Sequence, residues 1–189
     1  MKEGHYSWSN QSFRSFDSTV LEIITNQGIS GFGEICPLGP SYLPSYAEGV
    51  RVGIKKLSEI LLGKDPSNIN NINFLMDNAL KGHPYVKSAV DIACWDILGK
   101  KMNIPVYTLL GGKLQSKVKL FKVISRDIPE IMQEKVNEYQ EQGYQQFQMK
   151  VGAEPTVDIS RIKLVSKDLK TGNIWKAAKR SKYLCRRGV

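Results

Sequence analysis

The residues best suited to chemistry lie in the segment 146–151, which reads QFQMKV. Side chains alternate along a strand, so the polar residues, ending with Lys150, share one face and the apolar residues share the other. The apolar face suits packing against helices, which leaves Lys150 on the inner face at the carboxyl end of the strand. Barrel enzymes keep their chemistry at that end, where a partly desolvated lysine can act as a base. The alternative is a solvated lysine beside a loop.

Aromatic residues in two irregular segments form a second candidate site. Tyr42 and Tyr46 lie in a proline-rich loop predicted over 37–46, and Trp8 lies in a loop predicted over 6–16. Aromatic side chains on ordered loops suit cationic or apolar ligands. The alternative is that these rings pack against their own domain.

Other polar residues and glycines favour structural roles. His83 at a helix start is more typical of a capping or surface group than of a metal ligand. Asp91 and Asp96 fall on different faces of one helix, which favours structural hydrogen bonds over a catalytic carboxylate pair. Gly31 and Gly33 lack both the third glycine and the following helix of a dinucleotide-binding motif.

The first half of the chain reads as a hairpin followed by helices. Two β-rich runs, 18–24 and 29–36, flank a turn sequence and predict an antiparallel hairpin. Apolar residues at helical spacing predict a first helix after Ser45, the expected N-cap, and two more helices. These two helices are expected over 68–80 and 85–102, the second apolar enough to be central in a bundle.

After residue 112 the pattern changes to alternating strands and helices. Strands are expected over 117–125 and 144–151, and helices over 129–142 and 157–165. The first of these helices should turn Ile131, Val136 and Tyr139 inward. Alternation of this kind predicts a parallel sheet with crossover helices.

Charge and cysteine content exclude several classes of protein. The net charge is +9, but residues 167–189 hold eight Lys or Arg and one acid, so +7 of it lies there and +2 elsewhere. This disfavours a nucleic-acid binder that uses its whole surface. No apolar run approaches the ~20 residues of a membrane span, and residues 1–10 do not resemble a secretory signal. Three scattered cysteines without a CxxC pair favour a reducing, cytoplasmic setting over a disulfide framework or zinc site.

Residues 88–111, SAVDIACWDILGKKMNIPVYTLLG, closely resemble the signature of the mandelate racemase/muconate lactonizing enzyme family of the enolase superfamily. GFGEICP at 31–37 resembles a hairpin strand of the same family. The resemblance runs from about residue 4 to 168. It implies an α+β capping domain over 1–112, made of an antiparallel hairpin sheet and a helix bundle. The first two β/α units of an incomplete β/α barrel would follow over 113–168.

The family resemblance implies a reaction as well as a fold. Its members abstract a proton next to a carboxylate of a small-molecule substrate, and Mg²⁺ stabilises the enediolate. Their bases lie at the ends of the second and sixth barrel strands, with a Lys-x-Lys motif on the second. Here Gln148 replaces the first lysine and is expected to contact substrate, while Lys150 retains the catalytic position. Family members are often homo-oligomers.

Three segments resemble the hydroxyproline-type members of the family, the cis-3-hydroxyproline dehydratases and the proline-betaine or hydroxyproline-betaine epimerases. These segments are PLGPSYLPSYAEG at 37–49, GHPYVKSAVDIACWDILGK at 82–100 and FQMKVG at 147–152. The resemblance implies that Tyr42 contacts a cationic ring nitrogen and that Trp8 helps close a lid. Dipeptide epimerases and muconate cycloisomerases remain open as alternatives.

The chain also departs from the family pattern. The strand that normally opens the capping sheet is absent, and a complete barrel needs about 250 residues. The family's metal carboxylates and second base lie on strands three to six, so no metal ligand is identified here and no Mg²⁺ is expected to bind this chain. A third strand is expected near 173–175. The sequence then turns basic, so 169–189 is interpreted as an aberrant tail produced by a reading-frame change or premature end.

These departures predict a chain that is inactive as it stands and poorly soluble or partly unfolded. The alternative is a non-catalytic module that binds partners through its capping domain or its basic tail. Such a tail could bind nucleic acid or an acidic membrane. An unstructured, solvated tail is the simpler interpretation, and it disfavours nucleic-acid binding.

Overall fold

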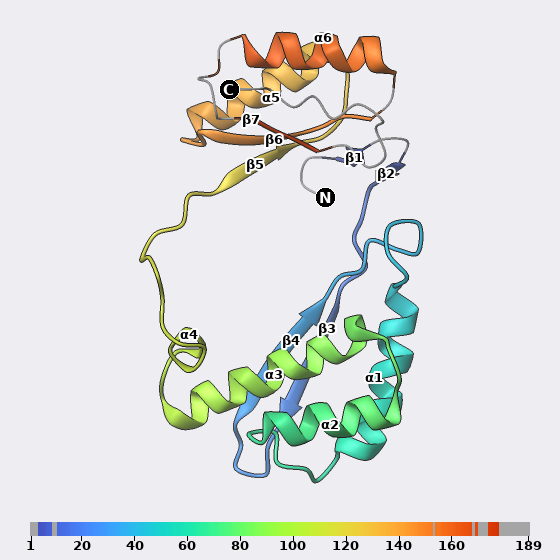
Figure 1. The fold of residues 1–189 in the computed structure, drawn as a ribbon, viewed down its shortest axis with the longest axis vertical. Coiled ribbons are helices and arrows are strands. Elements are labelled where there is room, and N and C mark those ends of the chain that lie inside the picture. The colour runs from blue at the N-terminus through green and yellow to red at the C-terminus, as the bar shows by residue number, and fades with distance from the viewer. Residues whose placement is uncertain (1–3, 9–10, 153, 168, 170–173, 178–189) are drawn as a thin grey trace. The chain divides into compact units, whose positions relative to one another are not determined.

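The computed structural model describes residues 4–8, 11–152, 154–167, 169 and 174–177 (Figure 1). It divides into two compact units. The helical unit is Phe16–Ser116, and the strand–helix unit combines Met1–Ser15 with Lys117–Val189. The sequence boundaries grouped 1–15 with the helical region, whereas in the structure the described residues of 1–15 pack with the later strands.

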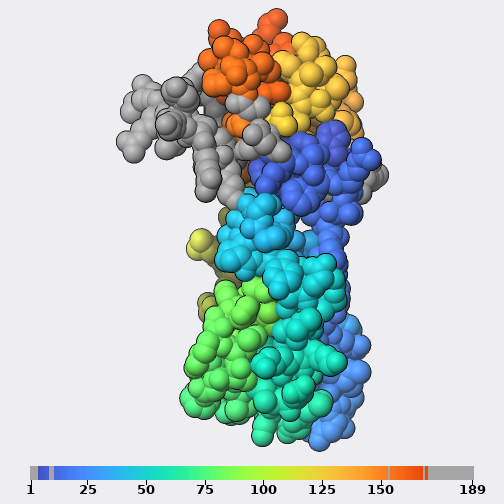
Figure 2. All heavy atoms as spheres, turned by 90° about the vertical axis from the view of Figure 1, so that its right-hand side faces the viewer, coloured from blue at the N-terminus to red at the C-terminus, as the bar shows by residue number. Residues whose placement is uncertain are grey.

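In the helical unit, a two-stranded hairpin packs against three long helices. β3 (Thr19–Ile24) and β4 (Ser30–Ile35) pair antiparallel. They are followed by α1 (Ala47–Leu61), α2 (Ile69–Ala79), α3 (Pro84–Met102) and the short α4 (Val106–Leu109). α3 lies along β4, and Figure 2 shows side chains of the three long helices filling one face of this unit.

The core of the helical unit follows from the amphipathic spacing of its helices. It is formed by Leu57, Ile72, Met76, Val86, Val90 and Cys94. Leu21 and Ile23 of β3 pack against it, while Val20 and Ile24 on the other face are exposed. The predicted helices are confirmed, but Ser45 is not the N-cap of α1. That position belongs to Tyr46, which makes no capping side-chain hydrogen bond, because the buried Ser45 lies one residue too early.

Cys94 gives the helical core a measurable signature. Burial, and secondarily the charge of Asp91, raises the pKa of its thiol to about 11. Because the thiolate is the reactive form, we expect Cys94 to react with a thiol reagent at pH 8 at least about 100-fold more slowly in the folded than in the unfolded chain. Reagent kinetics on a Cys185→Ser variant would measure this, with the half-buried Cys36 as the internal reference. Equal rates for Cys36 and Cys94 would contradict the packing described here.

The strand–helix unit holds a three-stranded parallel sheet in the order β5-β6-β7. Its elements are β5 (Phe121–Ile124), α5 (Pro129–Glu141), β6 (Gln146–Lys150), α6 (Pro155–Ser166) and β7 (Ile174–Ala177). The core between sheet and helices contains Ile124, Met132, Val136, Tyr139, Phe147, Met149 and Val165. The prediction of two β/α units is confirmed, and a third strand, β7, follows them where the family resemblance placed it.

Two details of this unit differ from expectation. β5 begins at Phe121, four residues later than predicted. On α5, Met132 is buried and Ile131 is 39% exposed, so Met132 takes the inward position that was predicted for Ile131. Val136 and Tyr139 are buried as expected.

The N-terminal segment predicted as a loop contains a small hairpin instead. β1 (Tyr6–Trp8) and β2 (Gln11–Phe13) pair antiparallel. Strands of three residues are too short to show a clear alternation of polar and apolar residues, which explains why a loop was predicted here. No helix in the described residues combines the length and apolarity needed to cross a membrane.

Candidate active site

The candidate base, Lys150, is the last residue of β6. Phe147 and Met149 are fully buried in the core beneath the helices, while Gln148 and Lys150 are half-buried on the opposite face. The alternation predicted from the sequence is therefore confirmed. In register, Gln148 lies between Val123 of β5 and Trp175 of β7.

The β1–β2 hairpin contributes an aromatic contact to Lys150. The Nζ atom of Lys150 lies 5.8 Å from the centre of the Tyr6 ring, a distance compatible with a cation–π interaction. The Tyr6 ring is tilted against Trp8 at 5.0 Å, and Trp8 stacks on Phe13 at 4.9 Å. Tyr6 was not among the expected site residues, because its place beside Lys150 depends on a pairing between distant segments.

Trp8 lies in a strand and only 5% of it is exposed. Its ring is enclosed by Tyr6 and Phe13, so it supports the ring that contacts Lys150. The expectation that Trp8 contacts substrate directly stays a prediction. Lys150, Gln148 and Trp8 all belong to the strand–helix unit.

The hairpin is tied to the loop that follows β5. The backbone N–H of Arg126 donates to the carbonyl oxygen of Ser7 at 2.9 Å, and the hydroxyl of Ser125 donates to the carbonyl of His5 at 3.4 Å. Figure 2 shows the hairpin segment against the segment that contains β5 and α5. These contacts hold Tyr6 at the carboxyl ends of the strands.

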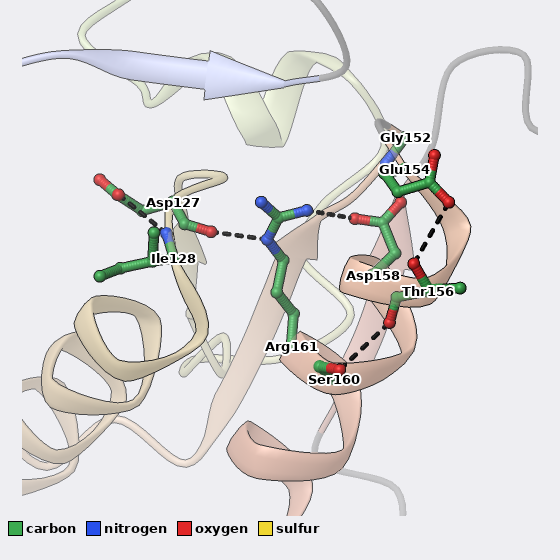
Figure 3. A network of polar contacts seen from close by, with 8 residues as sticks. All are labelled: Asp127, Ile128, Gly152, Glu154, Thr156, Asp158, Ser160 and Arg161. Carbon is green, nitrogen blue, oxygen red and sulfur yellow. Dashed lines mark hydrogen bonds and ion pairs between the residues drawn. The ribbon is translucent and has the colours of Figure 1, made fainter.

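A polar network fixes the loops after β5 and β6 (Figure 3). Arg161 of α6 is only 6% exposed. Its Nε donates to the carbonyl oxygen of Asp127 at 2.6 Å, and its Nη1 donates to Oδ1 of Asp158 at 2.7 Å. Oδ2 of Asp158 accepts from the backbone N–H of Gly152 at 2.7 Å. Because Gly152 is two residues beyond Lys150, this network fixes the chain where the candidate base leaves its strand.

We expect Asp158→Asn to weaken this network measurably. The change removes the charge that pairs with a buried guanidinium, so it should lower the free energy of unfolding by about 2 kcal/mol. Denaturant unfolding of the purified chain measures the difference. The matched control is Glu154→Gln, whose carboxylate accepts from Thr156 at an exposed position, and which should change stability by less than about 0.5 kcal/mol. Equal effects of the two changes would refute the bridging role.

The remaining sequence candidates lie in the helical unit. Tyr42 is 39% exposed in the loop before α1, where its backbone N–H donates to the carbonyl of Gly39. Asp91 accepts from the side chain of Asn73 at 2.8 Å. Asp96 accepts from the backbone of Phe32 at 2.9 Å and from Lys100 at 2.7 Å. The structural interpretation of both aspartates is confirmed.

His83 is exposed and does not cap the helix that follows it. It occupies the N-cap position of α3 in a left-handed conformation with no side-chain capping bond. Its Nδ1 lies 3.2 Å from the hydroxyl of Tyr85. His83 therefore has the predicted surface role and not the predicted capping role.

The described residues do not fit a magnesium site. Among them, no group of three or more His, Cys, Asp or Glu side chains could hold a metal ion, whereas Mg²⁺ takes near-octahedral oxygen coordination. The carboxylates nearest the strand ends already have partners. Asp127 accepts from the backbone of Ile128 and faces His5 at 3.5 Å, and Asp158 bridges Arg161 and Gly152.

Comparison with known proteins gives a consistent result over most of the chain. The family model described as "Mandelate racemase / muconate lactonizing enzyme, N-terminal domain" matches residues 6–111. Cis-3-hydroxy-L-proline dehydratase of Roseibium aggregatum is 53% identical over 175 residues, which are 92% of this chain and 48% of that protein. The chain thus spans about half the length of this relative.

Two solved structures show the same relationship in three dimensions. N-succinyl Arg/Lys racemase of Bacillus cereus has a TM-score of 0.86 and 34% identity, covering 92% of this chain and 47% of that one. A member of the enolase superfamily from Roseovarius nubinhibens, complexed with magnesium, has a TM-score of 0.79 and 39% identity. The match covers 92% of this chain and 50% of that one.

Proposed function

The chain belongs to the mandelate racemase/muconate lactonizing enzyme family of the enolase superfamily, and on that premise we propose that it carries the first base of a proton-transfer enzyme. In this proposal, residues 1–112 and 113–168 correspond to the capping domain and the start of the barrel. The observation that carries it is the position of Lys150. It ends the second barrel strand on the inner face, with the Tyr6 ring beside its amine.

The proposed role of Lys150 is to remove a proton from the carbon next to a substrate carboxylate, or to return one there. A lysine amine acts as a base only after it has given up its proton, and it then accepts the proton removed from the substrate carbon. Gln148 lies on the same face two residues earlier and can donate a hydrogen bond to substrate without competing for the proton. Tyr42 would contact substrate from the capping domain, and the aromatic hairpin around Trp8 would exclude water.

For the substrate we propose a proline- or hydroxyproline-like amino acid carboxylate. The support is the 53% identity to a protein named as a cis-3-hydroxy-L-proline dehydratase. Racemisation and epimerisation start with the same proton abstraction, and relatives named as a racemase and an epimerase are 37% and 33% identical. The parent reaction is therefore proposed as a dehydration, epimerisation or racemisation.

A complete enzyme of this kind would use Mg²⁺, as one similar structure is complexed with that ion. Since the described residues do not fit a metal site, no part of that chemistry is assigned to them. We propose that the 189-residue chain alone does not exchange the substrate's α-proton. Proton NMR in D₂O with cis-3-hydroxy-L-proline, L-proline and Mg²⁺ tests this, and exchange above the protein-free rate would contradict it.

The proposed function itself is tested with a chimera. Residues 4–167 would replace the corresponding part of the Roseibium aggregatum dehydratase, so that the remaining barrel comes from that relative. We expect the chimera to consume cis-3-hydroxy-L-proline, with the intact relative as the positive control. A folded chimera that neither consumes this substrate nor exchanges the α-proton of proline would count against it. The alternative of a non-catalytic binding module would then be favoured.

A cytoplasmic location is part of the proposal. Cys36 and Cys94, the cysteines within the described residues, are both free thiols, as in proteins of reducing compartments. The residues 170–173 and 178–189 of the basic tail lie outside the described part of the chain.

A further inference from the structure

A cavity lies in the strand–helix unit, between the β1–β2 hairpin and the loop that follows β5. Its volume is about 740 Å³, within the range of small-molecule sites. Its lining comprises Gly4, His5, Ser7, Ser12, Arg14, Arg126, Asp127, Ile128 and Arg161. Lys150 is not part of this lining, so the cavity needs an explanation of its own.

The charge of the cavity is strongly one-sided. Three guanidinium groups, those of Arg14, Arg126 and Arg161, line it together with the imidazole of His5. Asp127 is the one acid in this lining, and its carboxylate already accepts from the backbone N–H of Ile128 and faces His5. Asp158, outside the lining, balances the charge of Arg161. Arg14 and Arg126 still outnumber the one lining acid, Asp127, which favours an anionic occupant.

Several donors in the cavity still have capacity for a ligand. The Nε of Arg126 is buried and has no hydrogen-bond partner among the described residues, an arrangement that costs free energy unless a ligand or water accepts from it. Arg161 uses its Nε and Nη1 on Asp127 and Asp158. In Figure 3 its remaining terminal nitrogen contacts none of the other residues drawn.

Hydroxyl groups complete the set of donors. The buried Ser7 donates its hydroxyl to Ser12 at 2.9 Å. The hydroxyl of Ser12 accepts that bond and keeps its own proton to donate. Guanidinium groups match the two oxygens of a carboxylate or a phosphate with paired N–H donors, and a hydroxyl donor adds a third direction.

We propose that this cavity is a binding site for the oxyanion group, carboxylate or phosphate, of a small molecule. Arg126 supplies the central donor, with Arg14, Arg161 and Ser12 around it. The proposal stands independently of the catalytic role of Lys150, because it predicts binding by the 189-residue chain without a metal or a completed barrel.

Isothermal titration of the full chain with succinate, neutral succinamide and inorganic phosphate tests this site. We expect succinate to bind and succinamide not to bind. Arg126→Gln should weaken succinate binding at least 10-fold, whereas Arg51→Gln should leave it unchanged. Arg51 is a matched control because it is a surface arginine that pairs with Asp17 in the helical unit. Competition by phosphate would indicate a general oxyanion site, and a lack of competition a carboxylate site.

Circular dichroism would show whether the Arg126 variant is folded. If it is not, Ser12→Ala provides the second test and should weaken succinate binding several-fold. Equal binding of succinate and succinamide, no binding of either anion, or unchanged affinity in both variants would overturn the proposal.

Discussion

Replacing Lys150 by methionine is expected to abolish proton transfer in the chimera that carries residues 4–167 of this chain. Methionine matches the apolar stem of lysine as far as Cε but has no basic nitrogen. Loss of a positioned general base lowers rates by about 100- to 10,000-fold, so we expect kcat to fall at least about 100-fold. The rate of α-proton exchange, measured by NMR, reports this step directly.

Two further variants separate base chemistry from charge and packing. Lys150→Arg keeps a cation beside the Tyr6 ring but cannot give up its proton near neutral pH, so it should be as inactive as the methionine variant. Lys122→Met is the matched control. This lysine lies on the neighbouring strand, with its Nζ 4.6 Å from the Tyr139 ring, and its loss should change kcat by less than about threefold. An active Lys150→Arg enzyme would rule out the lysine as the base.

The position of Lys150 could be predicted because it depends on a local pattern. Side chains alternate between the two faces of a strand, and in β6 one face is wholly apolar, so the sequence predicts the face of every side chain. Phe147 and Met149 are buried as this pattern predicts. The helices were predictable for the same reason, since their apolar spacing extends over several turns. On α5, the buried residue is Met132 and not the expected Ile131. Met132 lies four positions before Val136 and seven before Tyr139, so it keeps the helical spacing from which Ile131 departs.

The surroundings of Lys150 could not be predicted, because they come from distant parts of the chain. Tyr6 is 144 positions earlier and reaches the strand end only through a hairpin with three-residue strands. The pair Asp158 and Arg161 was visible as an i,i+3 pair on a helix. The hydrogen bond from the backbone N–H of Gly152 to Asp158, however, depends on the path of the loop after β6. The same holds for the oxyanion cavity, whose arginines come from three separate segments.

Gly31 and Gly33 have a structural purpose that sequence motifs did not explain. They were rejected as a dinucleotide fingerprint, and in the structure both lie where β4 meets α3. A Cβ atom at Gly33 would overlap the carbonyl oxygen of Ala89 and lie 2.8 Å from its carbonyl carbon. A Cβ at Gly31 would overlap the carbonyl oxygen of Ala93. The two glycines therefore allow strand and helix backbones to approach within a distance that no side chain permits.

We accordingly expect Gly33→Ala to lower the free energy of unfolding by at least about 3 kcal/mol, because the added methyl group meets rigid backbone and α3 must move. Gly28→Ala is the control. Gly28 adopts a φ of +78 in the β3–β4 turn with nothing within 4 Å of an added Cβ, so its loss costs only backbone strain of about 1 kcal/mol. Denaturant unfolding of both variants measures the difference. Equal effects of the two substitutions would contradict the close approach of β4 to α3 as the reason why glycine occupies these strand positions.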